Sequence, residues 1–372
     1  MNEDKESVVC PGVYAGFVSD GLIAWYRENK RDLPWRNTGD PYKIWISEII
    51  LQQTRVDQGL DYYSRFVSRF PDVFELAGAE EDEVLKYWQG LGYYSRARNL
   101  HASAKMIVEE YNGKFPEKYE DILHLKGVGE YTAAAIISFA WNRPYPTVDG
   151  NVFRFLSRLL AIEVPIDTGT GKKLFTETAG ILMDEKQPGL FNQAMMEFGA
   201  LQCVPVSPDC NNCPFVFKCM AYIARSVNLL PVKQGKTKVE DRYLYYFHIK
   251  QGGETYLEKR KGKGVWYNLY EFPVIESGSP LEFMELRMHP RFQEIFGDIK
   301  EPKFRLVLEN KKHILSHRRL FASFYEVTVD ADFLCQTLSG ASDSLIRIPE
   351  NTIDTYPTHR LMEIYLEGSF YS

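Results

Sequence analysis

Apolar residues recur at different intervals in the two parts of this chain. Over residues 14–225 they recur every three or four positions, as in residues 84–88, 100–111 and 191–201, which predicts helices. Pro41 can occupy the first turn of a helix over residues 42–54. Beyond residue 241 the period approaches two. Residues 243–250, 255–260 and 321–329 are rich in aromatic and β-branched side chains, which predicts strands.

A polar and basic stretch separates these two parts. Residues 226–241 contain Pro231, Gly235 and several lysines, and they follow neither period, as is typical of a linker. The sequence therefore predicts a mainly α-helical region over residues 1–225, a linker over residues 226–241 and an α+β domain over residues 242–372.

Composition and charge limit the classes of function. The 372 residues are 45% hydrophobic and 25% charged, which is enough for two or three domains with buried cores. No apolar run reaches the roughly 18 residues that a membrane span requires, so we expect no membrane partner. The formal net charge of −6 argues against a general polyanion binder. If the protein binds DNA, it must use a local face and backbone N–H groups.

Four cysteines lie close together near the end of the helical region. Cys203, Cys210, Cys213 and Cys219 have the spacing C-x6-C-x2-C-x5-C, and thiolates placed so closely are the ligand set of an iron–sulfur cluster. Structural zinc is the main alternative. It usually brings two tight C-x2-C pairs or histidine partners, whereas this segment has one such pair and no histidine. We therefore expect one 4Fe-4S cluster.

A disulfide framework is a further alternative for these cysteines. It would suit a short secreted chain, whereas this chain is long and residues 1–20 show no charged-then-apolar leader. Cys10 and Cys335 are isolated, and a lone cysteine is more often a small buried apolar residue than a reactive one. We assign them no role.

A Gly-x-Gly turn joins two predicted helices. Gly127, Val128 and Gly129 precede a helix rich in small residues. Two glycines let the backbone approach a phosphate, and the helix that follows directs free N–H groups at that anion. Taken alone, such a turn is more often plain structure. About twenty residues later Asp149 opens another helix, where it can be an N-cap without excluding a chemical role.

These features together resemble the endonuclease III superfamily of DNA glycosylases, over roughly residues 15–225. The shared pattern is a helix-hairpin-helix, an Asp about twenty residues later and a four-cysteine cluster before a linker. Bifunctional members carry a nucleophilic Lys in the second half of the hairpin. This chain has Tyr131 there, and Lys126 lies before the glycines. The resemblance therefore implies a glycosylase without lyase activity.

Three further motifs resemble adenine DNA glycosylases of the MutY family. They are Leu-Pro-Trp-Arg at 33–36, Ser-Glu-x-x-Leu-Gln-Gln-Thr at 47–54 and Gly-Leu-Gly-Tyr-Tyr-Ser-Arg at 90–96. The second motif places Glu48 inside an apolar helix, where an acid would otherwise be a solvated or paired side chain. Cleavage of the bond to adenine needs an acid that protonates the purine at N7 and a negative charge that stabilises the oxocarbenium-like sugar. Desolvation should keep Glu48 protonated, and Asp149 should stay ionised.

The same resemblance implies supporting roles, each with ordinary packing or a surface ion pair as its alternative. Tyr131 and Asn151 would support the two carboxylates. The residues that would shape the pocket for the flipped adenine are Arg31, Trp35, Arg36, Leu51 and Glu197. The residues that would invade the opened base stack are Gln53, Thr54, Leu91 and Tyr93.

The C-terminal part resembles a Nudix domain that lacks its hydrolytic helix. Residues 264–273 resemble the strand before the catalytic box of Nudix hydrolases, but residues 274–286 have too few acids at the wrong spacing to bind magnesium. As in the MutY family, this domain would read the damaged base opposite the adenine. The family signature there is Phe-Ser-His, and this chain has Leu315, Ser316 and His317. This chain keeps the hydrogen-bonding pair Ser316 and His317, and it has Leu315 where the signature has an aromatic ring. A solvated β-hairpin is the alternative.

The sequence predicts a monofunctional glycosylase that removes adenine from double-stranded DNA where it is mispaired with 8-oxoguanine, and also where it is opposite guanine. We expect a monomer in the bacterial cytoplasm, associated with the nucleoid. The alternatives are a bifunctional glycosylase and lyase, disfavoured by Tyr131, and a catalytically dead DNA scaffold, disfavoured by intact Glu48 and Asp149.

Overall fold

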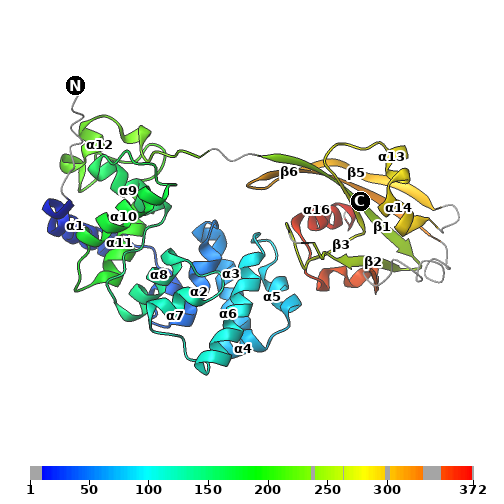
Figure 1. The fold of residues 1–372 in the computed structure, drawn as a ribbon, viewed down its shortest axis with the longest axis horizontal. Coiled ribbons are helices and arrows are strands. Elements are labelled where there is room, and N and C mark those ends of the chain that lie inside the picture. Colours follow the sequence, from blue (N-terminus) through cyan, green and yellow to red (C-terminus); the bar gives the residue numbers. More distant parts are fainter. Residues whose placement is uncertain (1–10, 236–238, 263, 298–301, 330–344, 371–372) are drawn as a thin grey trace. The chain divides into compact units, whose positions relative to one another are not determined.

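The computed structural model describes residues 11–235, 239–262, 264–297, 302–329 and 345–370 (Figure 1). Cys10 and Cys335 lie outside these residues. Contacts between Cα atoms divide the chain into two compact units. The N-terminal unit comprises Met1–Gly78 and Ala102–Gly235, and the C-terminal unit comprises Ala79–His101 and Lys236–Ser372. Among the described residues, no helix has both the length and the apolar character to cross a membrane.

The N-terminal unit is helical, as predicted. Its α-helices are α1 (Ala15–Asn29), α2 (Pro41–Leu51), α3 (Val56–Arg69), α4 (Val73–Gly78), most of α6 (Ser95–Tyr111), α7 (Tyr119–His124), α8 (Glu130–Trp141), α9 (Gly150–Leu160), α10 (Gly169–Leu182), α11 (Pro188–Leu201) and α12 (Met220–Ile223). Short 3-10 turns are η1 (Pro11–Tyr14), η2 (Pro34–Arg36), η3 (Val216–Lys218) and η4 (Val227–Leu229).

Four of these helices, α1, α9, α10 and α11, enclose one apolar core. At its centre the rings of Phe155, Phe198 and Phe215 pack with centroids 4.9–5.6 Å apart. Phe215 lies in the loop between Cys213 and Cys219. We call residues 203–219 the cysteine loop. The core therefore packs against the cysteine loop through aromatic contacts.

Helix α2 ends three residues earlier than the sequence predicts. Its first turn agrees with the prediction, because Pro41 occupies it and the Asp40 side chain accepts the N–H of Tyr42 at 3.0 Å. It ends at Leu51 because Gln53 adopts a φ of 58°, which a right-handed helix does not allow. The turn over residues 52–54 therefore leaves the helix.

The Gly-x-Gly turn joins α7 to α8. Gly127 has a φ of 77°, a conformation that favours glycine, and Val128 N–H donates to the carbonyl of Leu125 at 3.1 Å. The Ser103 hydroxyl donates to the carbonyl of Lys126 at 3.0 Å and holds the turn against α6. The predicted hairpin between two helices is thus present.

The first ten residues of the predicted linker belong to the N-terminal unit. Arg158 is buried on α9, and its Nε donates to the carbonyls of Val227 and Leu230 at 3.0 and 3.2 Å. The Asp167 carboxylate accepts the N–H groups of Gln234 and Gly235 at 2.9 and 2.8 Å. These hydrogen bonds hold residues 226–235 against the helices. The composition of this stretch did not indicate such contacts.

The C-terminal unit contains a seven-stranded mixed sheet with the central order β3-β2-β1-β6-β5. β1 and β6 run parallel, whereas β4 pairs antiparallel with β1 and β7 with β2. The three predicted strands are confirmed as β1, β2 and β6. The strands are β1 (Glu240–Gln251), β2 (Glu254–Lys259), β3 (Tyr270–Glu271), β4 (Val274–Ser277), β5 (Lys303–Ile314), β6 (Arg318–Thr328) and β7 (Leu345–Pro349).

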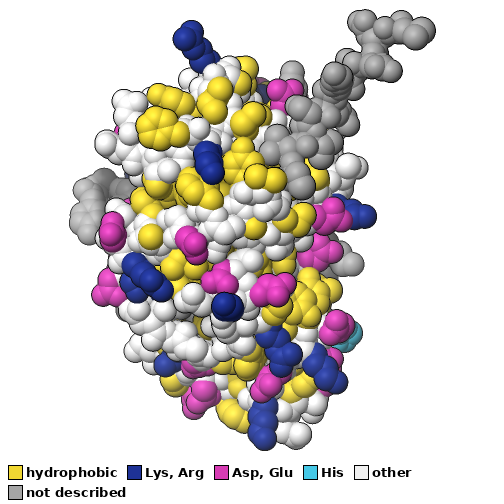
Figure 2. Space-filling view, turned by 90° about the vertical axis from the view of Figure 1, so that its left-hand side faces the viewer, with side chains coloured by type: hydrophobic (Ala, Val, Ile, Leu, Met, Phe, Trp, Pro, Cys, Tyr) yellow, Lys and Arg dark blue, Asp and Glu magenta, His cyan; other side chains and the backbone are white. Residues whose placement is uncertain are grey.

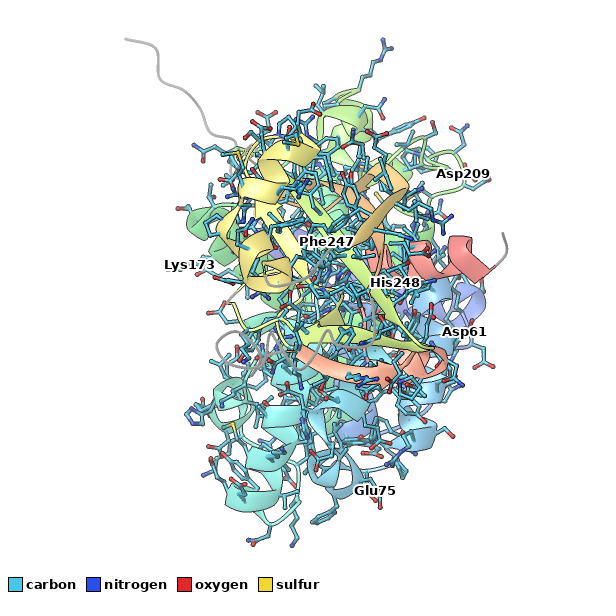
Figure 3. The ribbon with its side chains drawn as sticks, turned by 90° about the vertical axis from the view of Figure 1, so that its right-hand side faces the viewer. Asp61, Glu75, Lys173, Asp209, Phe247 and His248 are labelled. Atoms are coloured by element: carbon cyan, nitrogen blue, oxygen red, sulfur yellow. The ribbon has the colours of Figure 1, made fainter. Side chains whose placement is uncertain are left out.

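Helices cover both faces of this sheet. Phe247 and His248 are neighbours on β1 (Figure 3), and their different ring contacts place them on opposite faces, as alternation along a strand requires. Phe247 contacts Phe292 of α14 (Pro290–Phe296), next to α13 (Phe283–Met288). The His248 ring stacks on Phe272, and its Nδ1 lies 2.9 Å from the hydroxyl of Tyr365 on α16 (Arg360–Phe370), which follows η6 (Glu350–Thr355).

Residues 79–101 pack with the C-terminal sheet, although the sequence places them in the helical region. This segment contains α5 (Glu81–Trp88) and the start of α6. The Asp82 carboxylate accepts Lys259 Nζ at 2.6 Å and the Tyr270 hydroxyl at 3.0 Å. Gln89 Nε2 donates to Glu363 at 2.7 Å. Complementary polar groups far apart in sequence decide this placement, and helical periodicity does not report them.

Candidate active site

An open cavity in the N-terminal unit gathers the residues that the sequence singles out there. It encloses about 1640 Å³, part of which is open to solvent. The predicted catalytic residues, the predicted adenine-pocket residues and the turn after α2 all line it. They are Arg31, Trp35, Arg36, Glu48, Leu51, Gln53, Thr54, Tyr131, Asp149, Asn151 and Glu197.

Glu48 is a buried acid on α2, with 7% of the residue exposed. Burial raises the pKa of Glu48 to about 7, and the nearby negative charge of Asp149 adds to this effect. The Tyr131 hydroxyl, from the first turn of α8, donates to Glu48 Oε2 at 3.0 Å and acts in the opposite direction, as does Arg36. A carboxyl with this pKa still carries its proton in a large fraction of molecules near neutral pH.

Asp149 has a different environment, at the N-terminus of α9. Its Oδ1 accepts the N–H groups of Asn151 and Val152 at 2.9 and 2.8 Å, and its Oδ2 accepts the Asn151 side-chain amide at 2.7 Å. Burial raises the pKa of Asp149 above its ordinary value, and these donors and Arg154 only limit that rise. Hydrogen bonds to both oxygens, together with the helix N-terminus, favour the ionised carboxylate. Asp149 is therefore both the N-cap of helix α9 and a residue that lines the cavity.

Glu197 is fully buried and binds two arginines. Arg31 donates from its backbone N–H and Nε to Oε1, at 3.0 and 2.9 Å, and from Nη2 to Oε2 at 2.6 Å. Arg36 Nη2 donates to Oε2 at 2.6 Å. Burial alone would raise the pKa of Glu197, but the hydrogen bonds from Arg31 and Arg36 outweigh it and lower the pKa to about 2. With its oxygens occupied in this way, Glu197 fixes the two guanidinium groups at the cavity wall.

One nitrogen of this arginine pair remains available. Arg36 Nη1 is buried and has no hydrogen-bond partner among the described residues. Arg36 lines the cavity beside Trp35, whose ring packs edge-on against Tyr63 with centroids 5.1 Å apart. An unpaired buried donor is costly, so Arg36 Nη1 is suited to an acceptor supplied by water or by a ligand.

Helix α11 contributes cavity residues that the sequence motifs did not indicate. Gln193, Met196 and Ala200 line the cavity together with Glu197. Gln193 Oε1 accepts the Tyr26 hydroxyl at 2.8 Å, and Met196 Sδ lies 3.9 Å from the Tyr131 hydroxyl. Positions 193, 196, 197 and 200 follow the spacing of one helical face, so the helical period extended from Glu197 would have found them.

Arg154 is a further cavity residue that the motifs did not indicate. Its Nη2 donates to Asn151 Oδ1 at 2.9 Å and to the carbonyl of Gly199 at 2.6 Å. Its Nε donates to the carbonyl of Cys203 at 2.7 Å. Arg154 thus connects the residue that supports Asp149 to the first residue of the cysteine loop.

The four cysteines line one small cavity of about 410 Å³, whose walls include Phe155, Leu159, Phe198 and Phe215. None of the four is in a disulfide, and burial raises the pKa of the Cys213 thiol to about 12. Among the described residues, no group of three or more His, Cys, Asp or Glu side chains is arranged to hold a metal ion. Four soft sulfur donors around one apolar-walled space fit a polynuclear iron–sulfur group.

Gly127, Val128 and Gly129 line none of the cavities described here, and Lys126 beside them is exposed. No lysine is among the described residues that line the active-site cavity. A Cβ added at Gly129 would meet no atom within 4 Å, so the backbone at the start of α8 is open to a ligand.

Leu91, Tyr93, Ser316 and His317 line a separate cavity, in the C-terminal unit. It encloses about 1510 Å³, part of which is open to solvent. Leu315 N–H donates to the carbonyl of Arg318 at 2.8 Å and closes the tight turn between β5 and β6. Ser316 and His317 are therefore presented at the tip of a hairpin, where the hydroxyls of Ser316 and Tyr93 contact each other. The segment that contains Ser316 and His317 is thus a β-hairpin, and it also lines this cavity.

The loop before α6 supplies the opposite wall of this cavity. Gly90, Gly92 and Tyr93 have φ values of 94°, 72° and 47°. Such values are easy for glycine and strained for tyrosine. Trp88 Nε1 donates to the carbonyl of Gly92 at 3.1 Å and holds the loop. Tyr93 is 47% exposed and stands at the cavity mouth.

Comparison with known families and proteins finds matches to both parts of the chain. The family described as HhH-GPD superfamily base excision DNA repair protein matches residues 46–175, and the NUDIX domain matches residues 245–368. A relative from Buchnera aphidicola subsp. Baizongia pistaciae, called adenine DNA glycosylase, is 35% identical over 303 residues, which are 81% of this chain and 83% of the relative. A Schizosaccharomyces pombe protein of the same name is 31% identical over 375 residues, 83% of this chain and 81% of that protein.

Solved structures match the helical part. A thermostable thymine-DNA glycosylase superposes with a TM-score of 0.53 at 26% identity, covering 58% of this chain and 100% of that protein. Endonuclease III in a non-covalent DNA complex superposes with a TM-score of 0.50 at 20% identity, covering 57% of this chain and 97% of that protein, and shows a shared fold. Since the Buchnera relative shares more than a third of its residues over most of its own length, the chain belongs to the adenine DNA glycosylase family.

Proposed function

We propose that this protein is an adenine-specific DNA glycosylase of base excision repair, and that Glu48 and Asp149 carry the reaction. The observation that carries this proposal is the placement of two buried carboxyl groups on one cavity with different hydrogen-bond donors. Glu48 receives one hydroxyl donor and has a pKa raised to about 7. Asp149 receives three N–H donors. Such pairs separate the roles of acid and charge stabiliser.

In the proposed reaction Glu48 gives its proton to N7 of adenine, and the bond between N9 and C1′ of the deoxyribose breaks. The sugar becomes a cation resembling an oxocarbenium ion, which the Asp149 carboxylate stabilises electrostatically. Water then adds to C1′ and loses a proton to the Glu48 carboxylate, which regains the proton that it gave to adenine. The products are free adenine and an abasic site, and both carboxyl groups return to their first states.

The adenine itself would be flipped out of the duplex into the cavity. Its ring nitrogens are acceptors, and Arg36 Nη1 is a buried donor without a partner among the described residues. Glu197 would hold Arg36 and Arg31 in place. Trp35 offers an aromatic face for the base. These contacts support adenine binding at this wall of the cavity.

The enzyme would use water as its nucleophile and would not form a covalent DNA adduct. The described lining of the cavity contains no lysine, and Tyr131, at the place of the lyase lysine, hydrogen-bonds to Glu48. Borohydride should therefore trap no adduct, and the DNA strand should break only after alkali. Strong trapping that disappears in Lys126→Gln would favour the bifunctional alternative.

The cavity of the C-terminal unit is proposed to read 8-oxoguanine opposite the adenine. The oxidised base differs from guanine by an oxo group at C8 and a proton on N7. The hydroxyls of Ser316 and Tyr93 and the ring of His317 can donate or accept hydrogen bonds at that edge. Leu315 lines the cavity as well and would supply apolar contact in place of the aromatic ring of the family signature.

Binding to the DNA backbone would rely on local groups. Figure 2 shows Lys and Arg interspersed with Asp and Glu over the face that it presents, without a continuous basic surface. The exposed Gly127, the open backbone at Gly129 and the N-terminus of α8 are suited to a phosphate. We propose that a single chain acts on duplex DNA at the bacterial nucleoid, and the Buchnera relatives support the bacterial setting.

The cysteine loop is proposed to hold one 4Fe-4S cluster through Cys203, Cys210, Cys213 and Cys219. When bound, such a cluster supplies covalent cross-links among the four thiolates and can also carry an electron. Arg158 Nη1 lies 3.5 Å from Cys203 Sγ and would offset negative charge on the thiolates. No step of the proposed reaction passes through this loop.

The proposal is tested by single-turnover release of adenine from duplexes containing A:8-oxoguanine, A:G, A:T or C:8-oxoguanine. We expect release from the first two duplexes only. Glu48→Gln should bind A:8-oxoguanine with the wild-type affinity and release no adenine. Binding without release by the wild-type protein would instead favour a DNA scaffold, and more than about a tenth of the wild-type rate in Glu48→Gln would mean that another acid serves.

A further inference from the structure

A basic cavity adjoins the proposed lesion cavity of the C-terminal unit. It encloses about 1280 Å³, part of which is open to solvent. It lies between β1, β2, β4 and the residues that follow β2. The cationic side chains that line it are Arg242, Lys259, Arg260, Lys261, Arg291 and Arg318.

The carboxylates on the walls of this cavity are occupied. Arg260 pairs with Glu271 at 2.7 Å and also with Glu276, and Arg291 pairs with Glu258. Among the described residues, six cations and three carboxylates line the cavity, a formal excess of three positive charges, whereas the whole chain carries −6. The basic lining is therefore a local concentration of charge.

Three of the cations have partners outside the cavity lining. Lys259 pairs with Asp82 at 2.6 Å, Arg242 with Glu240 at 3.3 Å and Arg291 with Glu294 at 3.0 Å. Within the described part of the chain, Lys261 and Arg318 form no ion pair with a carboxylate. These two cations can bind an anion without first losing a partner.

The basic cavity and the lesion cavity share Gly264, Val265 and Arg318 as lining residues. A Cβ added at Gly264 would meet no atom within 4 Å, so the space beside the shared wall is open. The lesion cavity offers rings, including Trp266 and His313, and the basic cavity offers cations. An aromatic cavity beside a cationic one suits a base and the phosphates attached to its sugar.

We propose that the basic cavity binds phosphate groups of a nucleotide whose base occupies the lesion cavity. The inference rests on the proposed reading of a base in that cavity. Two sources share this chemistry. One is the lesion-bearing DNA strand, whose phosphodiesters would run through the basic cavity. The other is a free purine nucleoside triphosphate, whose compact negative charge matches the positive excess of the walls.

The test uses Arg242→Gln/Lys261→Gln in the full chain, because both residues line the basic cavity and neither lines the lesion cavity. Lys303→Gln/Arg305→Gln on β5 is the matched control, since it removes the same charge from the same sheet and lines neither cavity. Both double variants are made with Glu48→Gln, so that binding is measured without excision. A failure of the proposed glycosylase activity therefore leaves these measurements readable.

The first arm titrates dGTP and 8-oxo-dGTP by calorimetry, with 8-oxodeoxyguanosine as the probe without phosphate. The second arm measures binding of an A:8-oxoguanine duplex at several salt concentrations. A free-nucleotide site predicts triphosphate binding that the cavity variant weakens by about tenfold or more and the control leaves unchanged. A DNA-strand site predicts a slope of log K against log salt that is smaller by about 1–2 in the cavity variant.

Either result supports the phosphate site and identifies its source. The proposal is overturned if the cavity variant matches the control in both arms. It is also overturned if 8-oxodeoxyguanosine binds as tightly as 8-oxo-dGTP and the salt slope of the cavity variant does not change, because phosphates would then contribute nothing.

Discussion

The hydroxyl of Tyr131 donates a hydrogen bond to Oε2 of Glu48 at 3.0 Å. Tyr131 occupies the place where bifunctional relatives are expected to carry a lysine. A hydroxyl at this place stabilises the ionised form of Glu48 and so limits the rise in the pKa that burial causes. The residue at the expected position of the lyase lysine thus also affects the pKa of Glu48.

The first prediction concerns the pH dependence of excision. Since the proton on Glu48 is needed and the pKa of Glu48 is raised to about 7, the single-turnover rate should fall as the pH rises through about 7. Tyr131→Phe removes a donor that favours the ionised carboxylate, so the pKa of Glu48 should rise and the alkaline limb should move to higher pH. A limb at the same pH in both proteins would show that it reports another group.

The second prediction separates two roles of Asp149. In Asp149→Asn the amide oxygen can still accept the N–H groups of Asn151 and Val152, so helix α9 keeps its cap. The negative charge at the sugar cation is removed, and the rate should fall by at least about a hundredfold. Thermal unfolding serves as the control and should change little. Near-normal turnover by the folded variant would reduce Asp149 to a helix cap.

The third prediction concerns Glu197 and the stability of the fold. Glu197→Gln removes the charge that pairs with Arg31 and Arg36, and the free energy of unfolding should drop by about 3 kcal/mol at neutral pH. Because folding lowers the pKa of Glu197 from 4.5 to about 2, its contribution is complete above about pH 4.5 and is lost as the pH falls toward 2. Denaturant unfolding at pH 7 and pH 3 should show the difference between the two proteins shrinking. A constant difference would mean that the charge of Glu197 is not the cause.

The fourth prediction concerns the cysteine loop. Anaerobically purified protein should be brown and contain about four irons per chain. Cys213→Ser should lose iron and unfold at a lower temperature, because ligation contributes to folding. Ser226→Ala, outside the cysteine loop, is the control and should keep the iron. Stoichiometric zinc without iron in the purified protein would contradict the cluster and indicate that the four cysteines bind zinc.

The fifth prediction concerns the hairpin that is proposed to read the lesion. Ser316→Ala/His317→Ala should lower the preference for A:8-oxoguanine over A:G by about 1–3 kcal/mol for each hydrogen bond to the base that the variant removes, with little change in affinity for A:G. Gel-shift titration with both duplexes gives the ratio directly. The Lys303→Gln/Arg305→Gln protein should keep the wild-type ratio. An unchanged ratio in the hairpin variant would leave lesion reading to other residues.

Many residues that line the candidate active-site cavity were singled out from the sequence because they lie in contiguous motifs, such as the one that contains Glu48. Their roles stay predictions. Gln193, Met196 and Arg154 were not found, because each reaches the cavity from a helix without a distinctive local sequence. Their positions depend on how α9 and α11 rotate about their axes, and this rotation is set by burial in the shared core. A helical period drawn from Glu197 would have recovered two of them.

The elements of secondary structure were predictable where the period was strong, as in α6, β1 and β6. Their ends were not. Helix α2 ends at Leu51 because of the backbone conformation of Gln53, and no residue type in that turn requires this. Residues 79–101 have a helical period like that of their neighbours, but their polar partners lie on the C-terminal sheet. Pairing over such a separation is not encoded in local patterning.

The packing of residues 79–101 on the C-terminal sheet has an evolutionary consequence. Asp82, Gln89 and Tyr94 form hydrogen bonds with residues beyond 258, so a chain cut after Gly235 would leave all three without these partners. The C-terminal sheet is therefore not structurally independent of the sequence that precedes Gly235. If evolution removed or replaced the C-terminal sheet, we expect compensating substitutions in residues 79–101, which would lose their hydrogen-bond partners.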